Sequence, residues 1–270
     1  MHGDDPDEWS MRLGFEEAPA HFESRTQLAR VWTEAWTLRE VCCPNCGGRP
    51  LRQFANNSKV ADFHCGFCSE EYELKSSKGP FGKKIVDGAY EAMRERLSAR
   101  NNPNFLLLNY DSATQSATDL IVVPKHFFTP DIIEERKPLA TTARRAGWIG
   151  CNIVLDRVPQ SGRIFLLKDR VPVPRATVRE QWERTLFLRD AGLEARGWLI
   201  EVMKAVENIG EPTFKLDDVY AAEGRLQALY PHNQNVRPKI RQQLQELRDQ
   251  GLLEFLGRGT YRLLNPAIEQ

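Results

Sequence analysis

The sequence predicts two successive domains, a mixed-sheet α/β domain and a smaller α+β domain made of three helices and a hairpin. Helical patterns alternate with short apolar strand patterns over the first two thirds of the chain. Two Cys-x-x-Cys pairs interrupt that first part, and three further helical patterns precede a final strand pair. A length of 270 residues suits two hydrophobic cores.

The chain divides into three predicted segments: an N-terminal tail at 1–22, a first domain at 23–190 and a second domain at 191–270. The tail is acidic, which predicts a mobile segment. Its acids are Asp4, Asp5, Asp7, Glu8, Glu16 and Glu17.

Charge and hydropathy set limits on location and partners. The chain has 37 basic residues (Lys and Arg) and 37 acidic residues (Asp and Glu), so it has no overall basic excess. Binding of a nucleic acid must therefore be inferred from local clusters of charge. The sequence has no apolar run long enough for a membrane helix, and its N-terminus lacks the pattern of a secretion signal. We therefore expect a cytoplasmic protein with no membrane partner. No obligate protein partner is implied, and we expect a monomer.

The first domain begins with a helix at 23–40, where Leu28, Val31 and Trp32 recur at helical spacing. Turn residues then separate two strand patterns, which we expect to form a hairpin. These strands are 60–64 and 71–75. The elements predicted after them are a helix at 89–99, strands at 105–110, 120–123, 152–158 and 163–168, and a helix at 179–189.

The second domain has the pattern of a winged helix-turn-helix, in which three helices precede a two-stranded wing. The predicted helices are 195–207, 216–229 and 236–249, and the hairpin is 252–264. Along the third helix the apolar stripe leaves basic residues on the exposed side. The stripe consists of Val236, Ile240, Leu244 and Leu247.

Four cysteines have the spacing of a zinc site. Cys43 and Cys46 form one Cys-x-x-Cys knuckle, Cys65 and Cys68 form another, and 18 residues separate them. Four thiolates around Zn²⁺ leave no open position for water, which indicates a structural ion. The alternatives are a chance occurrence of cysteines or a redox pair, but redox motifs do not occur as two matched knuckles.

Two acids and a lysine suit phosphodiester hydrolysis. Strand alternation puts Glu73 and Lys75 on one face, and a hairpin between the two strands would bring Asp62 beside Glu73. Carboxylates bind Mg²⁺, which polarises a phosphate and acidifies a bound water, while Lys75 would orient that water.

A solvated strand edge with alternating charges is the competing interpretation of these three residues. The position of the cysteines favours the site. Because Cys65 and Cys68 lie between Asp62 and Glu73, the zinc ion would clamp the hairpin that presents the acids.

Several exact strings resemble the DpnI-type methyl-directed restriction endonucleases. They include Cys43-Pro-Asn-Cys46, Val60-Ala-Asp62-Phe-His-Cys65 and Cys68-Ser-Glu-Glu-Tyr-Glu73-Leu-Lys75. Asn102-Pro-Asn-Phe105 and Ala143-Arg-Arg-Ala-Gly-Trp148 extend the similarity, which runs from about residue 24 to residue 264.

The resemblance implies a PD-(D/E)xK nuclease core with a four-cysteine zinc site, followed by a C-terminal winged helix. It also implies magnesium-dependent, type II cleavage of double-stranded DNA at GATC sites whose adenine is methylated. The family's metal-binding acids correspond to Asp62 and Glu73 and its lysine to Lys75. Its zinc ligands correspond to Cys43, Cys46, Cys65 and Cys68.

Two regions are candidates for DNA contact. Arg144, Arg145 and Trp148 lie in a glycine-containing loop, where guanidinium groups suit guanine edges or phosphates and an indole suits a methylated adenine. The alternative is that Trp148 anchors the core and the two arginines are solvent-exposed charges. The candidates of the second domain are Asn235, which we expect to cap the third helix, with Arg237, Lys239, Arg241 and Gln242 on that helix and Arg258 at the wing tip.

Two other functions fit part of the sequence. A zinc-containing winged-helix transcription regulator would use the second domain and leave Asp62, Glu73 and Lys75 as surface charges. A repair nuclease that recognises a DNA structure would keep the chemistry without methyl specificity. Cleavage of methylated and unmethylated duplexes distinguishes all three.

Overall fold

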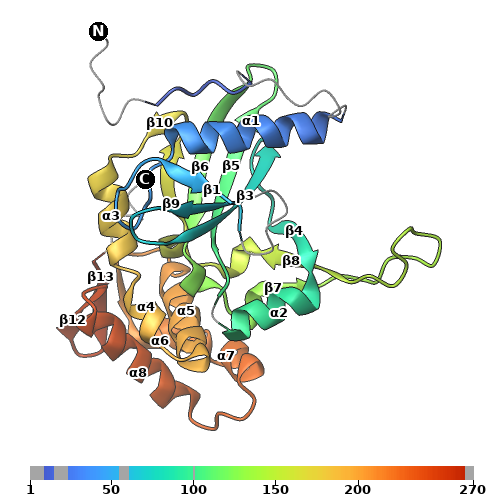
Figure 1. Ribbon diagram of the computed structural model, residues 1–270. Coiled ribbons are helices and arrows are strands. Elements are labelled where there is room, and N and C mark those ends of the chain that lie inside the picture. The colour runs from blue at the N-terminus through green and yellow to red at the C-terminus, as the bar shows by residue number, and fades with distance from the viewer. Residues whose placement is uncertain (1–8, 15–23, 55–60, 100, 265–270) are drawn as a thin grey trace. The chain divides into compact units, whose positions relative to one another are not determined.

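The computed structural model describes residues 9–14, 24–54, 61–99 and 101–264 (Figure 1). The chain folds into two compact units that are not contiguous in sequence. The first unit comprises 1–125, 133–155 and 163–183, and the second comprises 126–132, 156–162 and 184–270. None of the described helices is long and apolar enough to cross a membrane.

A seven-stranded mixed sheet is the centre of the first unit. Its strand order is β1-β2-β3-β5-β6-β9-β10. The strands are β1 (Leu51–Gln53), β2 (Phe63–Cys65), β3 (Glu71–Lys78), β5 (Asn104–Asp111), β6 (Ser116–Val123), β9 (Ile164–Lys168) and β10 (Val171–Pro172).

Within this sheet, β3 and β5 pair in parallel while the other neighbouring strands are antiparallel. All residues of β5 but the last are buried, as expected for a strand covered on both faces. The mixed sheet predicted from the alternating helices and strands is confirmed.

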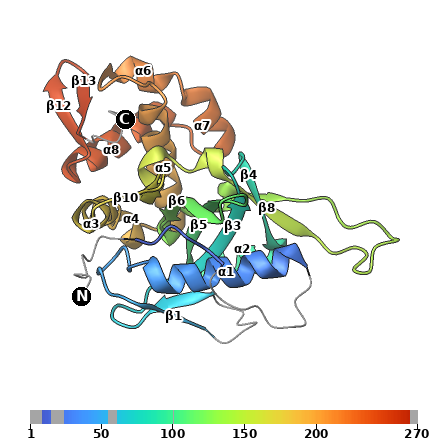
Figure 2. The same ribbon diagram turned by 90° about the horizontal axis from the view of Figure 1, so that it is seen from above.

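A second, three-stranded sheet in the same unit has the order β4-β8-β7 and is antiparallel. Its strands are β4 (Lys84–Ala89), β7 (Ile133–Glu135) and β8 (Gly150–Val154). Helix α2 (Tyr90–Ala99) packs on all three strands. Residues 136–149 join β7 to β8 and project away from the sheets of this unit in both views (Figures 1 and 2). We call them the arm.

Ser24 is the N-cap of helix α1 (Arg25–Glu40) and forms a capping box with Gln27. Trp36 is fully buried, and the Thr33 hydroxyl lies 3.4 Å from the Ser76 hydroxyl on β3. Helix α1 therefore covers the face of the sheet to which the even-numbered side chains of β3 point.

Part of the predicted acidic tail belongs to the first unit. Residues 1–8 and 15–22 lie outside the described residues. Leu13 is buried, the Ser10 carbonyl accepts a bond from the Trp36 indole, and Arg12 pairs with Ser116. The prediction of a mobile tail is therefore wrong for residues 9–14, whose aromatic and aliphatic side chains the acidic composition obscured.

Two other boundaries differ from the predictions. The strand expected at 152–158 ends at Val154 and continues as a 3₁₀ turn. The helix expected at 179–189 begins earlier, as α3 (Arg175–Glu183), and a separate short α4 (Phe187–Asp190) follows. The 3₁₀ segments are η1 (Lys125–Phe127), η2 (Pro130–Ile132), η3 (Leu155–Arg157) and η4 (Gln160–Gly162).

The second unit has the helices and wing expected of a winged helix. Its remaining elements are α5 (Leu193–Glu207), β11 (Thr213–Lys215), α6 (Leu216–Tyr220), α7 (Glu223–Leu229), α8 (Val236–Asp249), β12 (Leu253–Gly257) and β13 (Thr260–Leu263). The helix predicted at 216–229 is interrupted at Ala221, whose amide bonds to the Asp218 carbonyl. The wing gains a third strand, because β11 pairs with β13.

Earlier parts of the chain complete the core of this unit. Phe127, Phe128 and Ile132 are buried, and the Arg196 guanidinium on α5 donates to the Phe128 carbonyl. The His126 ring lies 2.8 Å from the Thr185 hydroxyl. The second unit therefore needs three separate stretches of chain.

Candidate active site and metal centre

The four predicted cysteines converge beside the edge of the large sheet. Their Sγ atoms all lie within 4.8 Å of one another, and the pairs Cys43–Cys68 and Cys46–Cys65 are each 3.5 Å apart. Four thiolates around one zinc ion, with Zn–S bonds of about 2.3 Å, would be separated by about 3.8 Å. The sulfur positions fit a tetrahedral zinc ion.

Local backbone geometry forms each knuckle. The Gly47 amide donates to the Cys43 carbonyl, and the Gly48 amide lies 3.4 Å from the Cys46 sulfur. In the second turn the Ser69 amide donates to the Cys65 carbonyl, as the Gly47 amide does to the Cys43 carbonyl, and the Phe67 amide lies 3.4 Å from the Cys65 sulfur. Amide contacts of this kind orient thiolate ligands and support their negative charge.

Burial raises the pKa of the Cys43 thiol, so a nearby cation is needed to keep it as a thiolate. Its sulfur lies 3.1 Å from the Tyr72 hydroxyl on β3. Cys42 and Cys151 are buried and do not belong to the cluster. The donor set of the cluster therefore fits zinc.

The hairpin of β2 and β3 brings Asp62 next to Glu73. Phe63 pairs with Tyr72, and the Asp62 amide donates to the Tyr72 carbonyl at 3.0 Å. The Asp62 carboxylate accepts a bond from the Leu74 amide at 2.8 Å. This backbone bond orients the carboxylate beside Glu73.

Glu73 and Lys75 lie on the same face of β3 and touch. The Lys75 ammonium is 2.6 Å from a Glu73 oxygen, and the Arg96 guanidinium of α2 approaches the other oxygen at 3.7 Å. Strand alternation predicted the shared face of the two side chains.

The sequence predictions did not include Asp87. This residue lies on β4, and its carboxylate is 2.6 Å from the Lys75 ammonium. It was missed because no motif marks it and because its approach depends on a strand of the other sheet. A short acid-containing strand after Lys75 is the only sequence signal that could have indicated it.

Burial and charge oppose each other in this cluster. Burial raises the pKa of Glu73, and the neighbouring Lys75 partly offsets this effect. Burial also disfavours the ammonium form of Lys75, but the carboxylates of Glu73 and Asp87 outweigh it and raise the pKa of Lys75. The lysine is therefore a fixed positive charge at neutral pH.

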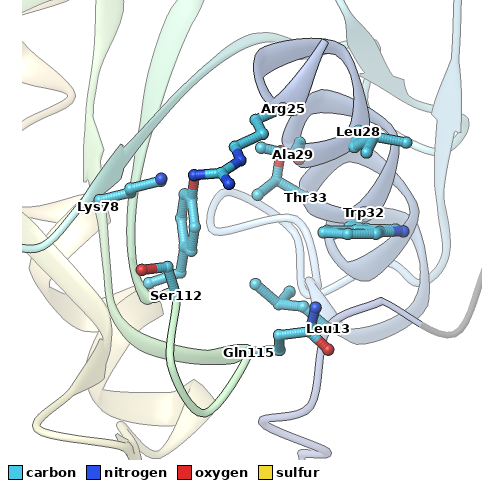
Figure 3. A pocket seen from close by; sticks show the side chains of 10 residues that line it. Leu13, Arg25, Leu28, Ala29, Trp32, Thr33, Lys78, Ser112 and Gln115 are labelled. Atoms are coloured by element: carbon cyan, nitrogen blue, oxygen red, sulfur yellow. The ribbon is translucent and has the colours of Figure 1, made fainter. Parts of the chain in front are cut away.

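A separate cavity of about 370 Å³ lies on the α1 face of the same sheet (Figure 3). Arg25 and Trp32 reach it from α1 and Lys78 from β3. Because Lys78 is an even-numbered residue of β3, the cavity is on the face opposite Glu73 and Lys75. It is therefore not part of the acid and lysine cluster.

The arm carries three of the candidate DNA contacts. Arg144 and Arg145 are exposed, and the Arg145 guanidinium lies 5.1 Å from the centre of the Trp148 ring. Trp148 is half-buried and its indole packs close to Gly150, where an added Cβ would be only 2.8 Å from the ring. Contact with the backbone of β8 fixes the ring, which remains partly open to solvent.

Helix α8 presents its apolar stripe to the core and its basic residues to solvent. Val236, Ile240, Leu244 and Leu247 are buried. Arg237 and Arg241 are exposed and both contact Tyr220, the first over its ring and the second through a 2.7 Å hydrogen bond to its hydroxyl.

The remaining candidates lie within α8, at its N-cap and on the wing. The Lys239 ammonium bonds to Gln242 on the same helix, and Arg258 is exposed at the turn between β12 and β13. Asn235 occupies the N-cap position, but its side chain makes no capping bond. The prediction that Asn235 caps α8 is therefore wrong. Pro238, at the third helical position, has no backbone N–H to donate to an N-cap side chain.

Comparison with known families identifies both parts of the chain. A protein-family model described as DpnI, Dam-replacing family, matches residues 11–191. A second model, described as DpnI_C, Dam-replacing HTH domain, matches residues 194–263. Together they cover the zinc cluster, the acid and lysine cluster, and the winged helix.

Proposed function

The chain belongs to the DpnI, Dam-replacing family, and on this basis we propose that it is a type II, methyl-directed restriction endonuclease that hydrolyses double-stranded DNA at GATC sites with methylated adenine. Family membership implies a nuclease in general; the substrate sequence and the hydrolysis are our proposal. The observation that carries it is the contact of Glu73 with Lys75 beside Asp62, on a hairpin that the cysteine cluster holds.

The proposed active site uses a small number of side chains. Asp62 and Glu73 would bind magnesium, which supplies Lewis acidity and a more acidic bound water. Lys75 would donate a hydrogen bond to the attacking water and offset charge that develops on the phosphate. Zinc, held by Cys43, Cys46, Cys65 and Cys68, would have a structural role.

We propose that two domains, at 23–190 and 191–270, both contact the DNA. In the first, Arg144 and Arg145 would contact DNA and Trp148 would contact the adenine methyl group. In the second, residues of α8 and the wing would enter the grooves. They are Asn235, Arg237, Lys239, Arg241, Gln242 and Arg258. A monomer in the cytoplasm without a membrane partner suits this role.

Strong methyl discrimination needs more than one contact. A buried methyl group is worth only about 0.8 kcal/mol. Two reading domains, each contacting a methyl group, would multiply the preference, and a pocket that penalises the unmethylated base would add to it. The presence of both a nuclease and a helix-turn-helix match supports reading by two domains.

The proposal is tested by digestion of one plasmid prepared with and without GATC adenine methylation. We expect discrete fragments from the methylated plasmid alone in magnesium buffer. Replacement of Lys75 by Ala should lower the cleavage rate on the order of 10²-fold or more, because the charge and the donor are both lost. Lys168→Ala is the matched control, since Lys168 lies on β9, away from the acids.

Three outcomes would contradict the proposal in different ways. Cutting of both plasmids would indicate a nuclease without methyl specificity. Binding without cutting, by folded protein that contains zinc, would indicate the regulator. Full activity of Lys75→Ala would show that Lys75 has no catalytic role and that the proposed active site is wrong.

A further inference from the structure

The Lys75 ammonium is shared between two carboxylates on different strands. Its nitrogen lies 2.6 Å from Glu73 Oε1 and 2.6 Å from Asp87 Oδ1. Glu73 belongs to β3, as Lys75 does, while Asp87 belongs to β4 in the other sheet. The ammonium therefore joins the two sheets of the first unit at the proposed active site.

Asp87 is the most buried of these partners. Its side chain is 5% exposed, compared with 19% for Glu73 and 21% for Lys75. Its second oxygen, Oδ2, is buried and has no hydrogen-bond partner among the residues that the structure describes. A buried carboxylate is costly unless a cation compensates it, and Lys75 is the cation in contact.

The arrangement favours a role for Asp87 through the lysine over a role as a metal ligand. Among the residues that the structure describes, the cysteine cluster is the one group of three or more metal-binding side chains whose ligand atoms converge. Asp62, Glu73 and Asp87 thus form no three-carboxylate cage. Asp87 instead faces the ammonium.

We propose that Asp87 is a positioning residue that holds the Lys75 ammonium for catalysis and keeps it from pairing with Glu73 alone. This inference rests on the proposed nuclease function. An ammonium has three donors, and Glu73 and Asp87 occupy two, which leaves the third for water or phosphate. Without Asp87, the Lys75 ammonium would pair with Glu73 alone. It would then compete with a bound metal ion for the Glu73 carboxylate.

The central test compares Asp87→Asn with wild type on methylated GATC duplexes under single-turnover conditions. The substitution conserves shape and removes the charge. We expect the cleavage rate at saturating DNA and magnesium to fall about 10- to 100-fold, because a displaced catalytic group costs that much. Affinity for the duplex, measured in calcium buffer, should change less than about twofold.

Two further readouts separate positioning from other roles. A metal ligand would raise the magnesium concentration for half-maximal rate, whereas the proposal predicts no change. In the magnesium-free protein, we expect the ¹⁵N signal of the Lys75 ammonium, assigned with Lys75→Met, to be visible in wild type and lost in Asp87→Asn because solvent exchange is faster. Asp111→Asn is the control, since Asp111 pairs with Arg170 away from this site.

The proposal is overturned if Asp87→Asn cuts at the wild-type rate, or if excess magnesium restores that rate. It is also overturned if the ammonium signal persists unchanged. In these cases wild type still cuts methylated DNA, so the proposed function stands. If wild type cuts neither substrate, the proposed function fails, and the ammonium signal alone then decides whether Asp87 holds Lys75.

Discussion

The acid and lysine cluster on β3 and the basic face of α8 use charge in opposite ways. In the cluster, the side chains of Lys75 and Asp87 are 21% and 5% exposed and contact each other across two sheets. On α8, the Arg237 side chain is 57% exposed and pairs with Glu223 of a neighbouring helix. Buried contacts fix geometry, while exposed pairs exchange partners at low cost.

The difference matches what each proposed task would require. Phosphodiester hydrolysis needs groups held within about 0.5 Å of their working positions. DNA contact needs arginines that can leave a protein partner for a phosphate or a base edge. Glu223 and Tyr220 would hold the α8 arginines until DNA replaces them.

The largest expected effect is loss of the zinc site. We predict that Cys65→Ser removes zinc from the protein and abolishes cleavage, because structural zinc contributes about 10 kcal/mol or more to folding of small zinc domains. Zinc content by mass spectrometry and the melting temperature measure this. Cys42→Ser, a neighbouring buried thiol outside the cluster, should retain zinc. Zinc-free but active Cys65→Ser protein would contradict a clamping role.

An intermediate effect is expected at α8. We predict that Arg241→Ala weakens binding of methylated DNA by about 1–3 kcal/mol, or about 5- to 150-fold, as for loss of a base contact. Arg248→Ala should have a smaller effect, because Arg248 lies in the last turn and recognition helices read DNA with their first turns. Fluorescence anisotropy in calcium buffer measures the affinity of each variant for methylated DNA. Equal losses would indicate a diffuse electrostatic surface.

The smallest expected effect is at the arm. We predict that Trp148→Ala lowers the preference for methylated over unmethylated duplexes by about 1 kcal/mol, roughly fivefold, for one methyl contact. The rate on methylated DNA at saturation should change less than the preference. Trp148→Phe should retain part of the selectivity because an aromatic face remains. Unchanged selectivity in Trp148→Ala would assign the indole to packing against Gly150.

Sequence patterns predicted those parts of the molecule that depend on residues close together in the chain. The stripe on α8 follows from helical periodicity, and the two knuckles follow from cysteine spacing. The shared face of Glu73 and Lys75 follows from strand alternation. Each of these needs only a few neighbouring residues.

Features that depend on distant chain segments escaped prediction. Asp87 meets Lys75 across two sheets, because β4 belongs to the three-stranded sheet and β3 to the seven-stranded one. Strand β11 is three residues long and forms because β13 offers it a partner. Tertiary pairing determines both, and a single sequence carries little signal for it.

Because the second unit is built from three stretches of chain, it cannot be moved to another protein as one continuous segment. Residues 126–132 and 156–162 belong to it together with 184–270. A graft that starts near residue 191 would leave behind Phe127 and Phe128, both buried, and the carbonyl partner of Arg196. Transfer of the complete second unit to another protein would therefore need three separate segments of this chain.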